Sequence, residues 1–262
     1  MPMALLEIAD VTKEFGGLKA LADVCLRIEQ GEIVSLIGPN GAGKTTLFNC
    51  ITGTMPPSSG SIRFAGAELV GLPPHEVARR GLSRTFQHIR LFAQMSVLEN
   101  VMVGRDFKGR TGVFSALARP PRVAREEAEN REKCLEVLGL FGERLLPRLG
   151  QAAGELSYAN RRRVEIARAL VSEPKLILLD EPTAGMNPHE TGQVVDLIRL
   201  IRDRGHTVLV IEHKMKVVMT VSDRVVVLDH GEKIAEGSPA EIAADAAVIE
   251  AYMGGRRRAQ AH

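Results

Sequence analysis

A glycine-rich stretch near the N-terminus has the residue types needed to hold a phosphate group. The segment GPNGAGKTT fits the pattern G-x-x-x-x-G-K-[ST] and directly follows the apolar run EIVSLI. Glycines let such a loop fold with its N–H groups inward, and the N-terminus of the next helix adds a positive field. Lys44 would neutralise β- and γ-phosphates, and the Thr45 hydroxyl would contact Mg²⁺. The stretch therefore predicts a P-loop rather than an ordinary glycine turn. The predicted phosphate-binding residues are Gly38, Pro39, Asn40, Gly41, Ala42, Gly43, Lys44, Thr45 and Thr46.

Two acids stand at the end of a second apolar run, in the segment PKLILLDEP. A P-loop requires a metal-holding acid at the end of a neighbouring strand, and Asp180 supplies one, contacting Mg²⁺ directly or through water. Glu181 can then face the attacking water as a general base. Without the P-loop, such a pair would be typical of a solvated loop.

Three further residues carry weak signals when each is taken alone. Gln87, in SRTFQHIRLF, could be a loop amide with local hydrogen bonds, and His213, at the end of TVLVIEH, could be a surface or capping residue. Phe15 could belong to the core. Their functional interpretation depends on the P-loop and the acid pair.

Together these residues resemble one family, the ATP-binding subunits of ABC transporters, and the resemblance covers nearly the whole chain. It implies that Phe15 stacks on adenine, that Gln87 contacts Mg²⁺ and water and senses the permease, and that His213 holds the γ-phosphate. Asp180 and Glu181 resemble the family's Walker B pair. The expected catalytic residues are therefore Glu181, His213 and Gln87, and the expected Mg²⁺ ligands are Thr45, Gln87 and Asp180.

The stretch LSYANRRR stands where the family has its signature motif, usually LSGGQ. In the family two subunits stack head to tail, so each γ-phosphate lies between one P-loop and the other subunit's signature. Ser157 keeps the hydroxyl, whereas Ala159 and Asn160 replace the expected glycine and glutamine. A negative φ at residue 159 would accept alanine with little strain, but a positive φ, or a methyl facing the phosphate, would impair closure. The shorter Asn160 is expected to lose a contact with the partner's ribose, which predicts a working but slow site.

A narrower resemblance is carried by FGGLKAL, LIGPNGAGKTTLFNCITG, RTFQHIRLF and AGMNP. Together they are similar to the branch that serves branched-chain amino-acid uptake. In that branch a tyrosine in the signature is usual, so Tyr158 is no defect. AGMN stands at the family's D-loop, with Asn187 in place of the commoner aspartate. The implied activity is ATP hydrolysis that energises an importer, with urea or short amides as alternative solutes.

The elements that must position these residues follow from the apolar periodicity. Two strands flank a turn at Gly16 and Gly17, GSIRFAGAEL resembles another hairpin, and a helix after the P-loop stops at Gly53. Asn187 caps a later helix, and Ser238 stands in capping-box register before a final helix.

Strands that alternate with helices predict an α/β fold with a parallel sheet. We expect a P-loop NTPase core, an N-terminal antiparallel β subdomain and an inserted α-helical subdomain. The chain would form a single ABC ATPase domain over residues 1–262. Residues 1–95 and 173–262 would form the ATP-binding core, and residues 96–172 the helical signature subdomain. A basic tail, Arg256 to Arg258, is expected to be disordered.

Composition limits the classes of function. A chain of 262 residues with 45% hydrophobic content can form one large domain with a proper core, and a net charge of +2 does not predict nucleic-acid binding. Cys25, Cys50 and Cys134 lack C-x-x-C spacing and predict inert thiols in a reducing compartment. We expect neither a secretory leader nor a membrane span, since no apolar run approaches the roughly 20 residues that a span needs.

Partners must then supply any membrane span. We expect transmembrane permease subunits, a second ATP-binding subunit (identical or a sister) and, indirectly, a periplasmic or extracellular solute-binding protein, with no nucleic acid. The expected location is peripheral, on the cytoplasmic face of the inner (plasma) membrane. The basic residues between Arg105 and Arg125 would face anionic headgroups or a permease loop, unless they form a solvated basic surface.

Two other functions stay open. A soluble ABC ATPase of repair or translation usually needs two nucleotide domains or a long coiled coil, neither of which the sequence indicates. A nucleotide-binding subunit with weak hydrolysis, paired with a more active sister ATPase, is favoured by Ala159 and Asn160. The presence of Glu181 and His213 counts against it.

Overall fold

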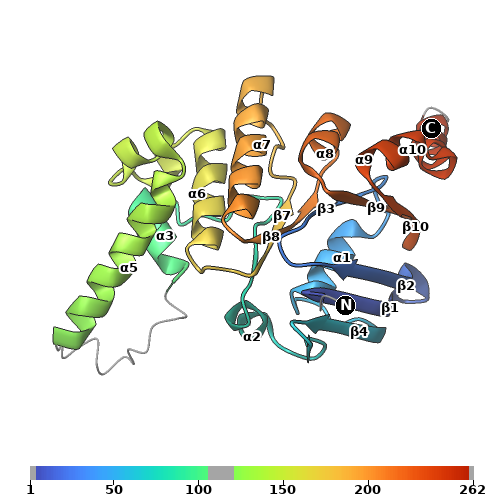
Figure 1. The fold of residues 1–262 in the computed structure, drawn as a ribbon, viewed down its shortest axis with the longest axis horizontal. Coiled ribbons are helices and arrows are strands. Elements are labelled where there is room, and N and C mark those ends of the chain that lie inside the picture. Colours follow the sequence, from blue (N-terminus) through green and yellow to red (C-terminus); the bar gives the residue numbers. More distant parts are fainter. Residues whose placement is uncertain (1–3, 106–120, 260–262) are drawn as a thin grey trace.

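The computed structural model describes residues 4–105 and 121–259, with side chains described for residues 4–105 and 125–252. Its centre is a six-stranded sheet with the order β10-β9-β3-β8-β7-β6 (Figure 1). Neighbouring strands are parallel except at one edge, where β10 is antiparallel to β9. The strands are β3 (Ile33–Ile37), β6 (Leu82–Arg84), β7 (Leu176–Asp180), β8 (Thr207–Ile211), β9 (Arg224–Asp229) and β10 (Glu232–Gly237). Every residue of β3, β7 and β8 is buried, as expected for strands covered on both faces.

A second, four-stranded antiparallel sheet has the order β2-β1-β4-β5. Its strands are β1 (Leu6–Phe15), β2 (Leu18–Ile28), β4 (Ser59–Phe64) and β5 (Ala67–Glu68). The turn between β1 and β2 uses Gly16 and Gly17, both with positive φ. The predicted parallel sheet and N-terminal antiparallel β subdomain are confirmed.

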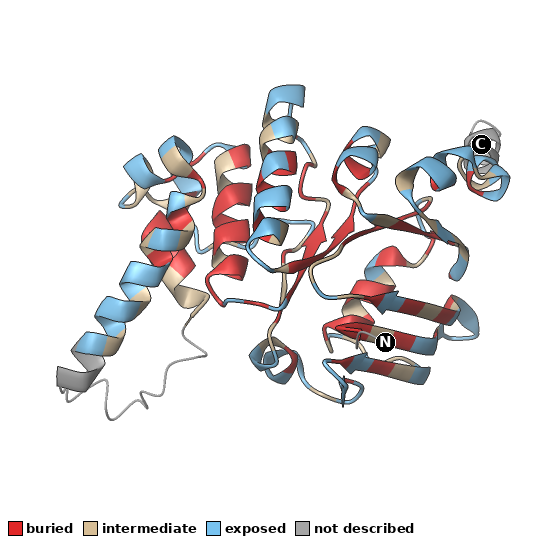
Figure 2. Ribbon diagram, in the orientation of Figure 1, coloured by how far each residue is buried: buried red, intermediate tan, exposed pale blue. Residues whose placement is uncertain are grey.

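Helices cover both faces of the central sheet (Figure 1). Helix α1 (Lys44–Ile51) lies between the two sheets, where its Phe48 packs in one core cluster with Ile62 of β4 and Leu209 of β8. The opposite face carries α6 (Tyr158–Leu170), α7 (Pro188–Asp203) and α8 (Met215–Val221). Buried residues form continuous stripes where these helices meet the sheet (Figure 2).

The segment between β6 and β7 is mainly helical, as predicted. Its described residues form α3 (Val97–Val103), α5 (Pro121–Gly139), three short 3₁₀ turns (Gly142–Arg144, Leu146–Arg148, Ala153–Glu155) and α6. These helices share one core cluster with Ile177 of β7 and Val208 of β8. The division into residues 1–95, 96–172 and 173–262 therefore stays a prediction, because the apolar packing is continuous across it.

Helix boundaries follow local rules where the sequence offers them. The Asn187 side chain accepts from the N–H of Glu190, whose carboxylate accepts in return from the Asn187 N–H, at 2.9 and 3.1 Å. Helix α7 ends at Asp203, shortly before Gly205, and α2 (Pro74–Arg79) begins at a proline. The capping interaction at Asn187 confirms the helix start predicted there.

Three elements differ from the sequence-based expectation. The short edge strands β6 and β10 were not predicted, since β6 has three residues and β10 is largely exposed. The predicted final helix is divided at Asp245 into α9 (Pro239–Ala244) and α10 (Ala246–Ala259). Asp245 is extended, and its carboxylate accepts from the N–H groups of Ala247 and Val248, which caps α10. The tail expected to be disordered, Arg256 to Arg258, lies within α10.

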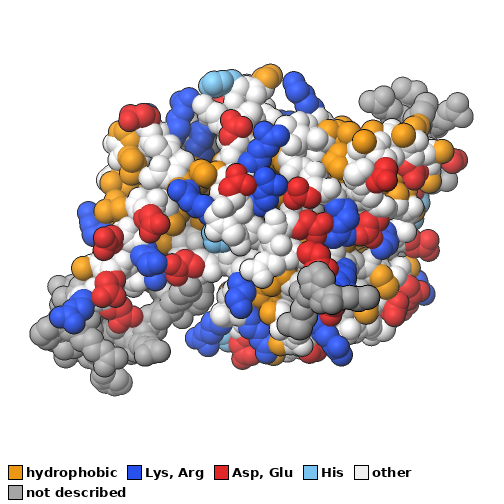
Figure 3. Space-filling view, in the orientation of Figure 1, with side chains coloured by type: hydrophobic (Ala, Val, Ile, Leu, Met, Phe, Trp, Pro, Cys, Tyr) orange, Lys and Arg blue, Asp and Glu red, His pale blue; other side chains and the backbone are white. Residues whose placement is uncertain are grey.

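Most of the basic cluster between Arg105 and Arg125 lies outside the described residues, so its proposed surface stays a prediction. Among the described residues, no helix combines the length and apolar character needed to cross a membrane. On the face drawn in Figure 3, Lys and Arg side chains are interspersed with Asp and Glu.

Candidate functional site

The predicted P-loop connects β3 to α1, and at two of its glycines a side chain would clash with neighbouring backbone. Gly38 has φ +147°, and a Cβ there would lie 2.0 Å from the carbonyl oxygen of Leu228. Gly43 has φ +98°, and its Cβ would lie 2.5 Å from the carbonyl oxygen of Ala20. The loop backbone is therefore packed against β9 and β2, which fixes its course into the first turn of α1.

Lys44 stands at the start of α1, and its side chain returns along the loop. Its Nζ donates to the carbonyl oxygens of Gly38 at 2.7 Å and Pro39 at 2.8 Å. Burial lowers the pKa of the Lys44 ammonium, and the negative charges of Glu181 and Asp180 oppose that shift. The lysine thus lies within the electrostatic reach of the strand-end acids.

The N-terminus of α1 is suited to an anion. Its cap residue, Gly43, has no side chain with which to accept from the first turn. The first N–H groups of a helix have no partner within the helix, and the helix dipole adds partial positive charge there. Thr45, in this turn, is exposed. These features fit the phosphates of a nucleotide, with the Thr45 hydroxyl available to a bound cation.

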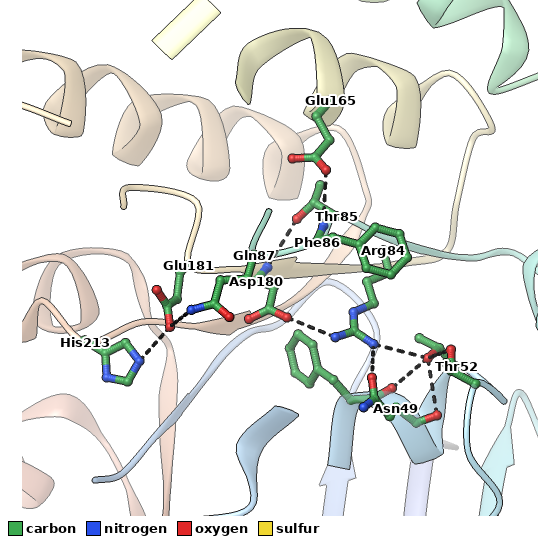
Figure 4. A network of polar contacts seen from close by, with 12 residues as sticks. Asn49, Thr52, Arg84, Thr85, Phe86, Gln87, Glu165, Asp180, Glu181 and His213 are labelled. Carbon is green, nitrogen blue, oxygen red and sulfur yellow. Dashed lines mark hydrogen bonds and ion pairs between the residues drawn. The ribbon is translucent and has the colours of Figure 1, made fainter. Parts of the chain in front are cut away.

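The two strand-end acids face different partners (Figure 4). Asp180 is 2% exposed, and its Oδ2 accepts from Nη2 of Arg84 at 3.0 Å. Nη1 of the same guanidinium donates to Oδ1 of Asn49 in α1 at 2.7 Å, and Cζ of Arg84 lies 5.4 Å from the Phe48 ring centroid. The Asp180 N–H donates to the hydroxyl of Thr85. One buried arginine therefore links β6, β7 and α1.

Glu181 leaves the strand in a left-handed conformation, with φ +47°. Such a conformation costs on the order of 1–3 kcal/mol for a residue other than glycine. Its Oε1 accepts from Nε2 of Gln87 at 3.3 Å and lies 2.8 Å from Nε2 of His213 (Figure 4). The structure thus brings the predicted catalytic residues Glu181, Gln87 and His213 together at one oxygen atom.

A buried acid beside His213 was missed by the sequence analysis. Glu212 is 2% exposed, and its carboxylate accepts from the Thr183 hydroxyl at 2.6 Å and from the N–H of His213 at 3.1 Å. It joins the turn that follows Asp180 and Glu181 to the loop that carries His213. The only sequence signal was an acid placed directly before the histidine in VIEH.

Phe15 lies at the end of β1 with 45% of its surface exposed, so the interpretation as a core residue is wrong. The ammonium of Lys13 lies 5.2 Å from its ring centroid. An exposed ring beside a cation can accept a stacked base.

The signature residues form the first turn of α6. The Ser157 hydroxyl accepts from the N–H of Asn160 at 3.4 Å and is the N-cap of the helix. Ala159 lies within α6 and is not among the described residues with positive φ. The residue is 4% exposed and its methyl packs in the core, so alanine fits without strain and its methyl is not on the exposed side of the helix. The Asn160 side chain accepts from Nη1 of Arg163 at 2.7 Å. The condition under which Ala159 is tolerated is therefore met.

Tyr158 fills the space above the D-loop. A Cβ built on Gly185 would lie 3.3 Å from a ring carbon of Tyr158, so the ring covers that glycine. Its hydroxyl accepts from Nη2 of Arg162 at 3.2 Å. Among the described residues, Ser157, Ala159 and Asn160 make no hydrogen bond to the P-loop of their own chain.

The chain resembles known proteins in both sequence and structure. Residues 21–184 match the family described as "ABC transporter", and residues 232–257 match "Branched-chain amino acid ATP-binding cassette transporter". The chain is 44% identical over 255 residues to the high-affinity branched-chain amino acid transport ATP-binding protein LivG of Salmonella typhimurium, covering 97% of this chain and 99% of LivG. It is 43% identical to the corresponding protein BraF of Pseudomonas aeruginosa, with the same coverage. A crystal structure of the ADP conformation of an ATP-binding cassette of an ABC transporter superposes with a TM-score of 0.84 at 33% identity, covering 96% of this chain and 99% of that one.

Arg84→Met should destabilise the chain strongly, because it leaves the buried carboxylate of Asp180 without its cation. Breaking a buried ion pair on one side costs about 3–5 kcal/mol. Urea denaturation followed by circular dichroism measures the free energy of unfolding. Arg27→Met is the matched control, since Arg27 is 49% exposed and pairs with the exposed Glu29. It should cost about 1 kcal/mol or less. Equal losses in the two variants would contradict a structural role for the Arg84–Asp180 pair.

Proposed function

Because this chain belongs to the ABC transporter family, we propose that it is the ATP-hydrolysing subunit that energises an importer of branched-chain amino acids. Nucleotide binding and ATP hydrolysis coupled to transport are the activity of this family. The observation that carries the proposal is the convergence of Gln87 and His213 on one oxygen of Glu181, beside a P-loop lysine. The choice of solute is supported by relatives named for branched-chain amino acid transport.

The proposed nucleotide site is made of groups that suit ATP. Residues 38–46 supply the phosphate cradle, in which Lys44 neutralises charge and the N-terminus of α1 supplies N–H groups. Phe15 supplies the ring for adenine. Thr45, Gln87 and Asp180 would hold Mg²⁺ through oxygen atoms, which is the ligand type that the ion prefers. Bound there, the ion would neutralise charge on the phosphates.

Glu181 is the proposed general base, which takes a proton from the attacking water at a carboxylate oxygen. Its left-handed backbone turns the side chain away from the path of the strand, toward Gln87 and His213. Gln87 donates to the carboxylate through Nε2, which leaves its amide oxygen available for water or Mg²⁺. His213 would hold the γ-phosphate. Glu212 fixes the backbone on which His213 stands.

The signature of a second subunit would complete the site. Ser157 and the N-terminus of α6 would meet the nucleotide of the partner, which can be an identical chain or a sister ATPase. The substitution at Ala159 is accommodated in α6, which supports hydrolysis and weakens the case for a subunit with weak hydrolysis. Asn160 is held by Arg163 within its own chain, which supports a reduced contact with the partner's ribose.

The permease would dock beside the segment that carries Gln87. A cleft there is lined by Val77 of α2, Arg84, Phe86 and Arg168 of α6, so it is bordered by both the core and the helical segment. A permease element in this cleft would contact the segment that reaches Glu181. The proposed location is therefore peripheral, on the cytoplasmic face of the inner (plasma) membrane. A solute-binding protein would act indirectly, through the permeases. Urea or short amides remain alternative solutes.

Glu181→Gln should bind ATP with normal affinity, and its turnover should fall by about 100-fold or more. The variant keeps shape and can still accept from Gln87 and His213, but it cannot take a proton. ATP turnover of the assembled complex and the lifetime of the closed dimer are the measurements. Turnover equal to the wild type would remove Glu181 from the role of base.

The double reversion Ala159→Gly with Asn160→Gln should raise ATP turnover only modestly, when it is assayed with the permeases. One neutral hydrogen bond is worth about 0.5–1.5 kcal/mol, which corresponds to a several-fold change. Ala159→Gly alone is the control and should give no rise, because the Ala159 methyl is buried in the chain's own core. A change from undetectable to normal activity in the double variant would show that the native signature is inactive and would favour the weak-hydrolysis alternative.

A further inference from the structure

A fully buried arginine in α6 holds the backbone of the segment that carries Gln87. Arg162 has no exposed surface. Its Nη1 donates to the carbonyl oxygen of Phe86 at 2.5 Å, and its Nη2 donates to the carbonyl oxygen of Gln87 at 2.7 Å. Both bonds cross from α6 to a segment 75 or 76 residues earlier in the chain.

Glu165, one turn later in α6, completes this contact. Its Oε2 accepts from Nη1 of Arg162 at 2.7 Å. Its Oε1 accepts from the N–H of Phe86 at 3.3 Å (Figure 4). Glu165 is 2% exposed, and burial raises the pKa of its carboxyl group, while the positive charge of Arg162 opposes that shift. The amide and carbonyl of Phe86 are thus both bound by one ion pair.

We call the contact of Arg162 and Glu165 with the backbone of Phe86 and Gln87 the clamp. It is needed because the backbone leaves the sheet at this point. Strand β6 ends at Arg84, and the last ladder-like bond of this segment runs from the N–H of Thr85 to the carbonyl oxygen of Leu178. Beyond Thr85 the chain leaves the sheet, so the polar groups of Phe86 and Gln87 need other partners. Side chains of α6 provide them.

The same helix begins with the signature. Ser157 is its N-cap, and the hydroxyl of Tyr158 accepts from the Nη2 of Arg162 that also binds the Gln87 carbonyl. The first turn of α6 and the backbone of Gln87 are therefore joined through one rigid guanidinium group. A shift of this turn would be transmitted to Gln87 through two charge-assisted hydrogen bonds.

We propose that Arg162 is a positioning residue for Gln87. It sets the distance between the Gln87 amide and Glu181, and it links that distance to the position of the signature turn. The proposal rests on the proposed function, because it assigns Gln87 a role in ATP hydrolysis. Any shift of the first turn of α6 when a second subunit contacts Ser157 would therefore change the contact of Gln87 with Glu181 of the same chain.

Kinetics of the full chain with Mg²⁺ and ATP separate positioning from a purely structural role. Arg162→Met should lower kcat about ten-fold and leave KM within about two-fold, since hydrogen bonds to charged groups are worth roughly a factor of ten. In the Gln87→Ala background the same substitution should have little further effect, because Arg162 acts through the missing amide. An undiminished ten-fold loss in that background would overturn the proposal.

A second variant distinguishes a loss of positioning from a loss of folding. Arg162→Met with Glu165→Leu removes both buried charges, and such replacement by apolar residues is often neutral for stability. It should melt near the wild-type temperature and show the same loss of kcat. Wild-type kcat in this folded variant would also overturn the proposal.

Arg105→Met is the matched control, since Arg105 donates to the carbonyl oxygen of Val171 at the other end of α6. Its kcat should be unchanged.

Hydrogen exchange provides a measurement that needs no ATP. The peptide containing Phe86 and Gln87 should exchange about ten-fold faster or more in Arg162→Met and at the wild-type rate in Arg105→Met. Unchanged exchange in Arg162→Met would show that the clamp does not hold this segment. If exchange rises but the wild-type chain, with or without its permeases, hydrolyses no ATP, the proposed function fails while the physical clamp stands, and Arg162 then has no role in hydrolysis.

Discussion

The change of backbone conformation at the end of β7 is the constraint on which the rest of the site depends. Asp180 is the last extended residue of a fully buried strand, and Glu181 follows with φ +47°. Because of this turn, two adjacent carboxylates serve different partners. Asp180 faces a buried arginine from β6, and Glu181 faces Gln87 and His213. Adjacent acids on a straight strand would point to opposite faces of the sheet, and one of them would enter the core.

The need to balance buried charges explains which residues stand beside Asp180 and Lys44. A carboxylate that is 2% exposed needs a cation, and Arg84 supplies it from the strand beside β7. Lys44 is buried on the other side, and both acids favour its charged form against the effect of burial. The negative charges at the strand end therefore favour the charged form of Lys44 at the site where a triphosphate and its cation would bind. In α6, the buried charges of Arg162 and Glu165 likewise balance each other, and the pair binds the backbone of Phe86.

The sequence predicted what depends on contiguous residues. The P-loop, the strand-end acids and the caps at Asn187 and Ser238 are short patterns, and the structure confirms their elements. The convergence of Gln87 and His213 on Glu181 was reachable only through the family resemblance. Arg84, Glu212 and Arg162 could not be assigned, because their partners lie far along the chain and nothing local distinguishes them from surface charges. The edge strands β6 and β10 escaped prediction because they are short or exposed. Whether Ala159 is tolerated in the signature depends on its φ and its burial, and the sequence determines neither.

We propose that this chain hydrolyses ATP to energise uptake of branched-chain amino acids. The most direct measurement is ATP turnover by the transporter assembled in vesicles with its solute-binding protein, loaded with leucine or with urea. We expect leucine-loaded binding protein to raise turnover, urea-loaded binding protein to leave it unchanged, and Lys44→Ala to abolish turnover in both cases. Stimulation by urea alone would contradict the assignment of the solute. Turnover that survives Lys44→Ala, or the absence of ATP binding by the wild-type chain, would contradict the assignment of the site.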